Sequence, residues 1–167
     1  MSEILLECCV GSPLSAVNAE LGGAARVELC SALELGGLTP SWGSIRLAKE
    51  KIDIPLFVLV RPRGGDFHYA PSELDTMKSD IAAARELGAD GIVLGALQGD
   101  GKIDAEGTAG LIEAAAGAGI TFHRAFDMTR DPDEAIDDLI ACGVDRVLSS
   151  GQRPKAHEGL DILRKMI

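Results

Sequence analysis

Two stretches of the chain repeat a short pattern of one carboxylate and one thiol. Glu7-x-Cys9 and Glu28-x-Cys30 each lie within or at the end of an apolar run typical of a β-strand. Side chains two residues apart point to the same face of a strand, and neighbouring strands lie about 4.8 Å apart. If the two strands match in register, the pattern predicts paired carboxylates beside paired thiols. Thiolates this close together suit Cu(I), a soft metal ion.

A second interpretation of these cysteines stays open. Free cysteines are among the most buried residues, so Cys9 and Cys30 are also consistent with small apolar side chains of the core. Cys8 points to the opposite strand face from Cys9, and Cys142 lies at the end of an expected helix. We expect both of these to belong to the core.

The stretch Arg61-Pro62-Arg63-Gly64-Gly65 follows an apolar run and combines two guanidinium groups with an accessible backbone. Arginines and free backbone N–H groups bind phosphates and carboxylates, so Arg61 and Arg63 are candidate anion-binding residues. Arg61 is also expected to neutralise Glu7 or Glu28, because a buried carboxylate needs a partner.

A histidine ends another apolar run, in His123-Arg124-Ala125-Phe126-Asp127. Histidine is a common acid–base group and metal ligand, and Asp127 is placed to fix its tautomer. Together with the carboxylates this gives the candidate acid–base groups Glu7, Glu28 and His123. The candidate anion-binding residues become Arg61, Arg63 and Arg124. A weaker candidate for an anion is Ser149-Ser150-Gly151.

The elements that must position these side chains alternate along the chain. Apolar runs predict strands near 4–10, 25–30, 55–61, 90–95, 119–123 and 145–149. Amphipathic stretches predict helices near 14–22, 43–51, 72–87, 105–117, 132–142 and 157–167. Three strands share a lead-in of a helix-ending glycine and a small residue, at Gly23, Gly88 and Gly143, with Gly119 a close variant.

This alternation predicts an α/β fold of TIM-barrel-like parallel (β/α) units, about six of the eight that a closed barrel needs. A doubly wound sheet is the competing architecture. Charged residues within the strands, such as Glu7, Arg26 and Glu28, favour a barrel with a polar lumen over an apolar open sheet. We expect one domain over residues 1–167.

The composition excludes several classes of partner. The net charge of -10 argues against nucleic acid, because phosphate binding needs a basic face. No apolar run reaches the roughly 18 residues of a membrane span, and residues 1–7 lack the basic start of a signal peptide. Four irregularly spaced cysteines do not form a disulfide framework. The sequence therefore predicts a cytoplasmic protein that binds neither nucleic acid nor membrane.

Several of these stretches together closely resemble the copper homeostasis protein CutC family. They are Leu6-Glu7-Cys8-Cys9-Val10, Arg26-Val27-Glu28-Leu29-Cys30-Ser31, Gly36-Gly37-Leu38-Thr39-Pro40-Ser41, the Arg61 to Phe67 loop and Phe122-His123-Arg124-Ala125-Phe126-Asp127. The resemblance implies a TIM-barrel-like fold, a cytoplasmic location and a role in copper handling. It also implies Cys9 and Cys30, which match the motif cysteines of the family, as Cu(I) ligands.

The chain departs from the family pattern in places. Cys8, Trp42 and His68 stand where aliphatic residues are usual, and Ser149-Ser150-Gly151-Gln152 lacks a second glycine. Members of the family carry two further strand–helix units, whereas this chain stops at Ile167 in an expected helix with no stop signal. We expect a chain truncated at its C-terminal end, or a homo-oligomer in which another copy covers the gap.

Two functions from different classes follow. One is a copper homeostasis protein that binds Cu(I) through Cys9 and Cys30. The other is a TIM-barrel enzyme acting on a small anionic metabolite, bearing a phosphate or a carboxylate, by acid–base chemistry. Copper binding needs the thiols and tolerates the loss of the arginines, and the enzyme needs the reverse. In a third interpretation the chain is an inactive fragment whose lumen charges only satisfy one another.

Overall fold

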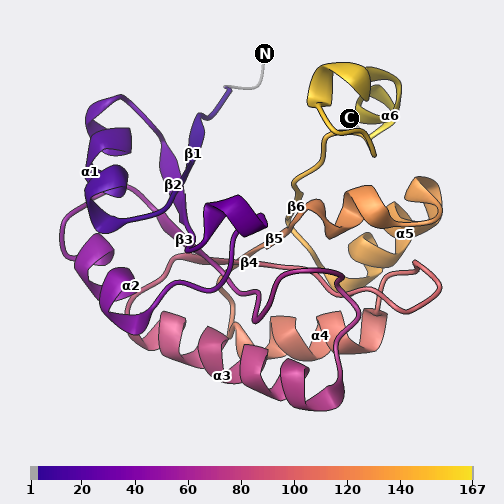
Figure 1. The fold of residues 1–167 in the computed structure, drawn as a ribbon, viewed down its shortest axis with the longest axis horizontal. Helices are drawn as coiled ribbons and strands as arrows, with labels where there is room; N and C mark the ends of the chain where they lie inside the picture. Colours follow the sequence, from indigo (N-terminus) through magenta and orange to yellow (C-terminus); the bar gives the residue numbers. More distant parts are fainter. Residues whose placement is uncertain (1–3, 167) are drawn as a thin grey trace.

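The computed structural model describes residues 4–166, in which six strands form one parallel sheet in sequence order (Figure 1). The strands are β1 (Glu7–Val10), β2 (Arg26–Leu29), β3 (Leu56–Leu59), β4 (Gly91–Leu94), β5 (Gly119–Phe122) and β6 (Arg146–Val147). A doubly wound sheet reverses its strand order at a switch point, and this sheet does not. The expected TIM-barrel-like, incomplete α/β architecture is confirmed.

Helices α1 to α5 connect the strands along the outside of the curled sheet, and α6 follows β6. They are α1 (Pro13–Leu21), α2 (Trp42–Lys49), α3 (Pro71–Glu86), α4 (Ala105–Ala114), α5 (Pro132–Cys142) and α6 (Leu160–Lys165). Short 3-10 helices occupy η1 (Leu33–Leu35), η2 (Arg124–Met128) and η3 (Ala156–Glu158). Between residues 4 and 166, no helix is long and apolar enough to cross a membrane.

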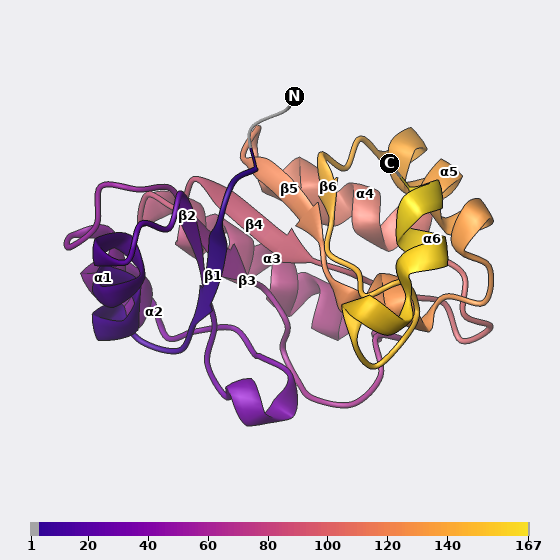
Figure 2. The same ribbon diagram turned by 90° about the horizontal axis from the view of Figure 1, so that it is seen from above.

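The sheet has two differently lined faces, because its side chains alternate. The larger core cluster fills the space between the convex face and the helices, and it includes Val27, Ile81 and Ile92. A smaller cluster lies on the concave face, where Cys30, Phe57, Leu59 and Val93 meet. Figure 2 shows β1 and β6 at the two ends of the sheet. The concave face is therefore an open lumen.

The helix boundaries follow the signals in the sequence. Asp131 caps α5 by accepting hydrogen bonds from the backbone N–H groups of Asp133 and Glu134. Gly143 ends the same helix with φ +81°, a left-handed conformation that side chains with a Cβ rarely adopt. On α3, Met77, Ile81 and Ala84 form the buried face.

Several elements are shorter than the sequence predicts. The first strand was expected from residue 4 but begins at Glu7, because its partner β2 begins only at Arg26. The last strand was expected over 145–149 but pairs only at Arg146 and Val147. The final helix begins at Leu160, and the last residue of its expected span, 167, lies outside the described residues.

The lower part of the lumen is built around one aromatic ring. Phe57 lies opposite Gly91 in the neighbouring strand, and a Cβ at Gly91 would stand 2.1 Å from the ring. Arg26 and Arg146 stack on the same ring, with their Cζ atoms 4.9 Å and 4.8 Å from its centroid. The guanidinium groups of Arg26 and Arg146 thus stack on the Phe57 ring. The ring has room in this position because residue 91 is a glycine.

Candidate functional site

The register of β1 and β2 differs from the one that would pair Glu7 with Glu28 and Cys9 with Cys30. Glu7 pairs with Arg26 and Cys9 pairs with Glu28, so β2 is displaced by two residues relative to the expectation. Glu7 consequently forms an ion pair with Arg26. The expected carboxylate pair of Glu7 and Glu28 is wrong, because the shift replaces one of the two carboxylates with a guanidinium.

The displacement nevertheless brings the two thiols together. Cys30 follows the last residue of β2, and its Sγ lies 3.5 Å from the Sγ of Cys9. Glu28 joins them, with its Oε1 3.4 Å from the Sγ of Cys30. One ligand atom from each of these three residues lies within 4.8 Å of the other two. The prediction that Cys9 and Cys30 face the same side of adjacent strands is confirmed.

The protonation of this cluster follows from its burial. Cys9 is exposed whereas Cys30 is only 1% exposed, so a metal ion has access from the side of Cys9. Burial raises the pKa of the Glu28 carboxyl above its usual range. The hydrogen bond with Cys9, burial and the negative charge of Glu28 raise the pKa of the Cys30 thiol. The hydrogen bond from Cys30 lowers the pKa of Cys9, which makes Cys9 the better thiolate.

His123 lies just beyond β5 and is 5% exposed. Burial and the nearby charge of Arg61 lower the pKa of His123 to about 3, so the imidazole is neutral at pH 7. Its Nδ1 accepts a hydrogen bond from the backbone N–H of Ala125, 3.2 Å away. The hydrogen is therefore on Nε2, which has no partner in the described part of the chain.

Asp127 does not fix the tautomer of His123, contrary to the expectation. It accepts hydrogen bonds from the Nε of Arg124 at 2.8 Å and from the hydroxyl groups of Ser149 at 2.7 Å and Ser150 at 2.9 Å. These contacts lower the pKa of Asp127, although its burial acts in the opposite direction. Asp127 therefore joins the loop after β6 to η2, and the serines expected near an anion are used in this contact.

Arg61 is 5% exposed but does not neutralise Glu7 or Glu28, contrary to the expectation. Its Nη1 donates to the backbone carbonyls of Leu35 and Gly37, and its Nη2 donates to that of Gly65, over 2.9–3.1 Å. Arg61 thus connects two loops at the mouth of the lumen.

Arg63 turns away from the lumen. It forms ion pairs with Glu73 at 2.5 Å and Asp66 at 3.1 Å, and it stacks on Tyr69. Of the three candidate anion-binding arginines, the structure therefore brings Arg61 and Arg124 to the mouth and leaves Arg63 outside it.

The thiols, the histidine and two arginines line one cavity of about 260 Å³ at the carboxyl ends of the strands. This is the end of a parallel barrel at which ligand sites are found. Its lining consists of Cys9, Glu28, Cys30, Gly36, Leu59, Arg61, Phe67, His123, Arg124 and Leu148. Glu7 is absent from this lining, because its ion pair with Arg26 lies deeper in the lumen.

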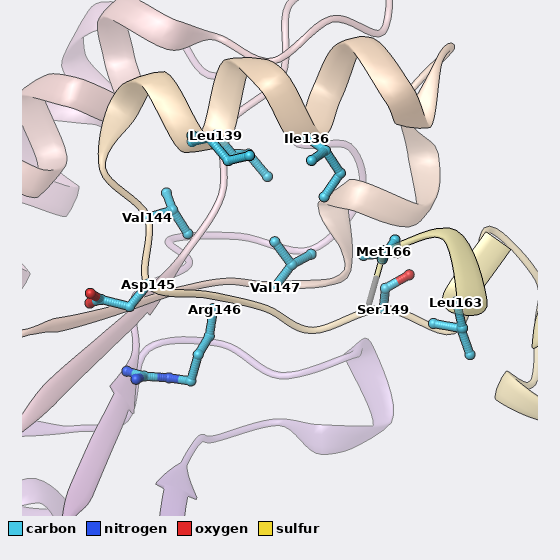
Figure 3. A pocket seen from close by; sticks show the side chains of 10 residues that line it. Ile136, Leu139, Val144, Asp145, Arg146, Val147, Ser149, Leu163 and Met166 are labelled. Atoms are coloured by element: carbon cyan, nitrogen blue, oxygen red, sulfur yellow. The ribbon is translucent and has the colours of Figure 1, made fainter. Parts of the chain in front are cut away.

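A larger hollow of about 480 Å³ lies beyond β6 (Figure 3). Apolar side chains of α5, β6 and α6 line most of it, among them Ile136, Leu139, Val147 and Leu163. In Figure 3 the guanidinium of Arg146 points to the other side of the strand. This hollow offers apolar surface for packing and few groups for chemistry.

Comparison with known proteins agrees with this geometry. A sequence model of the CutC family matches residues 4–167. The chain belongs to the CutC family. Its relatives include the copper homeostasis protein cutC homolog of Homo sapiens, 50% identical over 98% of this chain and 60% of the human protein. A CutC family protein of Mesorhizobium japonicum is also 50% identical, over 98% of this chain and 63% of that protein.

Solved structures support the same membership. The putative copper homeostasis protein CutC of Streptococcus agalactiae superposes with a TM-score of 0.91 at 37% identity, over 98% of this chain and 81% of that one. A phosphonopyruvate hydrolase, solved with oxalate and Mg++, gives a TM-score of 0.67 at 16% identity, which shows a shared fold only. This CutC-family chain spans about 60% of the length of the human relative.

Three side chains of the cavity lining, those of Leu59, Phe67 and Leu148, were not predicted from the sequence. Phe67 belongs to the Arg61 to Phe67 loop but received no role, although its ring lies 4.9 Å from the His123 ring and 4.8 Å from the Cζ of Arg61. The only signal was an aromatic residue directly after a Gly-Gly pair in a loop already expected at the mouth.

Proposed function

We propose that this CutC-family chain acts in copper homeostasis by binding Cu(I) between Cys9 and Cys30. The observation that supports this best is the 3.5 Å separation of the two sulfur atoms at the open end of the lumen. Two thiolates form a soft ligand set, which Cu(I) prefers over carboxylate oxygens. The relatives named copper homeostasis protein point to the same process.

The protonation of the cluster fits an ion that enters from solvent. Cys9 is the exposed member of the pair and has the lowered pKa, so it supplies the first thiolate. Cys30 then loses its proton as the ion binds, and the positive charge of the ion stabilises the second thiolate. The proposal includes a cytoplasmic location, because a reducing compartment keeps both thiols free.

An acid–base enzyme acting on a small anion is the weaker candidate. Glu7 is held by Arg26 below the cavity, and His123 has a pKa too low for proton exchange near pH 7. Of the candidate acid–base groups, only Glu28 combines a place in the cavity with a raised pKa.

The test is an anaerobic competition titration of Cu(I) against a chromogenic chelator. We expect the double variant Cys9→Ser, Cys30→Ser to bind Cu(I) at least about 100-fold more weakly, since even the loss of a group that only orients a ligand costs 10- to 100-fold. The matched control is Cys142→Ser, because Cys142 lies on α5 outside the cavity.

Equal Cu(I) affinity in the double variant and in the native chain would contradict the proposal. A native chain that prefers Zn²⁺ over Cu(I) in the same competition would also contradict it, because the Glu28 carboxylate would then dominate the ligand set.

A further inference from the structure

A buried cation without a carboxylate partner lines the cavity beside the thiols. Arg61 takes part in no ion pair within residues 4–166. Its terminal nitrogens are used by three backbone carbonyls, whereas its Nε is buried and without a partner in that range. A guanidinium does not lose its proton, so the positive charge persists. Buried charges are paired as a rule, and this one lacks its counterpart.

The second unpartnered group in the cavity wall is the Nε2–H of His123. Nδ1 already accepts a hydrogen bond from the backbone N–H of Ala125. The ring nitrogen that remains for a ligand, Nε2, is therefore a hydrogen-bond donor. A neutral donor beside a cationic donor recognises an oxygen atom that carries negative charge. Arg61 and His123 are both more than nine-tenths buried, so bulk water does not fully satisfy the two unpaired N–H groups.

Phe67 packs against the side chains that carry both donors. Its half-buried ring contacts the His123 ring and the guanidinium of Arg61, and it is carried by the loop that contains Gly64 and Gly65. Leu59 and Leu148 supply further apolar wall in the same cavity of about 260 Å³. The space therefore suits a small molecule with a short apolar body and one charged end.

We propose that this cavity binds a small organic monocarboxylate, whose carboxylate accepts hydrogen bonds from the Nε of Arg61 and the Nε2 of His123 when the Phe67 ring moves aside. Arg124, the other arginine of the cavity lining, forms an ion pair with Asp127, so Arg61 supplies one positive charge to balance one carboxylate. Two free donors match the two oxygens of a carboxylate, whereas a phosphate brings close to two charges and three strong acceptor oxygens. Cys9 and Cys30 line the same cavity, but neither thiol is one of the two donors, so the proposal does not rest on copper binding.

The test compares propionate with propionamide, which has nearly the same shape but no charge. In protein with ¹⁵N-labelled histidine, we expect propionate at millimolar concentration to shift the Nε2 resonance of His123. The resonances of His157, which is exposed, should stay in place. Propionamide should bind at least about tenfold more weakly than propionate, because it offers no charge to Arg61.

Variants separate the site from the fold and from copper. Arg61→Lys keeps a cation but removes the Nε–H, and it should weaken propionate binding about tenfold. Phe67→Ala keeps both donors and removes the cover, so it should bind propionate at least as tightly as the native chain. Propionate binding should also survive in Cys9→Ser, Cys30→Ser.

Two results would overturn the proposal. If propionate shifts His123 in neither the native chain nor Phe67→Ala, Arg61 only connects the two loops. If inorganic phosphate shifts His123 at lower concentration than propionate does, the site does not select monocarboxylates. Loss of propionate binding in the double cysteine variant would likewise overturn its independence from the thiols.

Discussion

His123 and Arg61 share one cavity wall, and burial acts on them differently. An imidazole escapes the cost of a buried charge by losing its proton, whereas a guanidinium keeps its charge. The pKa of His123 falls to about 3 for this reason, with Arg61 adding to the effect. Burial thus leaves one neutral donor and one cation side by side.

The depressed pKa of His123 makes stability depend on pH. In the unfolded chain His123 takes up a proton near pH 6.5, but in the folded chain only near pH 3, so stability falls as pH drops below 6.5. Between pH 7 and pH 5 this loss is about 2 kcal/mol. We expect His123→Gln to remove that part of the pH dependence, measured by urea unfolding at both pH values.

His157 provides the control for this measurement, because its side chain is 72% exposed. His157→Gln should keep the pH dependence of the native chain. If His123→Gln loses as much stability between pH 7 and pH 5 as the native chain does, His123 is not a neutral buried group.

Among the elements, β3 and β4 show how neighbouring strands make room for a bulky side chain. The Phe57 ring extends across Gly91 and also approaches Gly119, where a Cβ would stand 3.3 Å from the ring. Two successive strands thus carry glycine at the positions that the ring crosses. The ring in turn supports Arg26 and Arg146.

Gly91→Ala should destabilise the chain by about 1–3 kcal/mol, because the added methyl group overlaps the Phe57 ring. Urea unfolding at pH 7 measures the change. The double variant Gly91→Ala, Phe57→Leu should recover part of the loss, since the smaller side chain leaves space.

Gly43→Ala is the matched control, because Gly43 lies in α2 with nothing within 4 Å of an added Cβ. It should leave stability unchanged or raise it by up to about 1 kcal/mol. An equal loss in Gly43→Ala and Gly91→Ala would show that the Phe57 ring is not the cause.

Most of the elements were predictable from the sequence because their signals are local. Asp131 and Gly143 bound α5 by capping and by left-handed conformation, and neither depends on distant residues. Strand ends depend instead on partners. The run before Glu7 is as apolar as a strand, yet nothing in the sequence around it shows that the partner strand begins only at Arg26.

The sequence predicted which residues belong to the site better than it predicted which of them contact one another. The repeated Glu-x-Cys pattern placed Cys9 and Cys30 together, but the register between β1 and β2 is a non-local property. That register gave Glu7 the partner Arg26 and brought Glu28 to the thiols. The partners of Arg61 are backbone carbonyls, which no side-chain pattern reveals.

At the scale of the whole molecule, the sheet is open, with β1 and β6 as its two edge strands. Within residues 4–166, β1 and β6 each pair with one neighbour only, and the apolar hollow lies next to β6. Unpaired strand edges and exposed apolar surface favour association with other chains. An exposed Ile140, 70% accessible, adds to that surface.

We therefore expect the chain to self-associate as its concentration rises, measured by size-exclusion chromatography with light scattering. Ile140→Glu should shift the distribution toward the monomer, because it places a charge in the hollow. Leu47→Glu is the control, since Leu47 is exposed on α2, away from both sheet ends. A native chain that stays monomeric at every concentration would contradict this expectation.

The strictly sequential strand order also bears on how the chain acquires its structure. Each strand pairs with the one before it, and helices α1 to α5 pack in the same succession. In the described residues no sheet pairing joins the two ends, so each strand pairing needs only the strand before it, and the contacts across the lumen, such as that of Arg146 with Phe57, form afterwards. Each new unit can settle on the previous one while the chain is being synthesised. In this respect the open sheet resembles a stack of repeats, in which structure spreads from neighbour to neighbour, and we expect the unit of the two-residue β6 to open before the others.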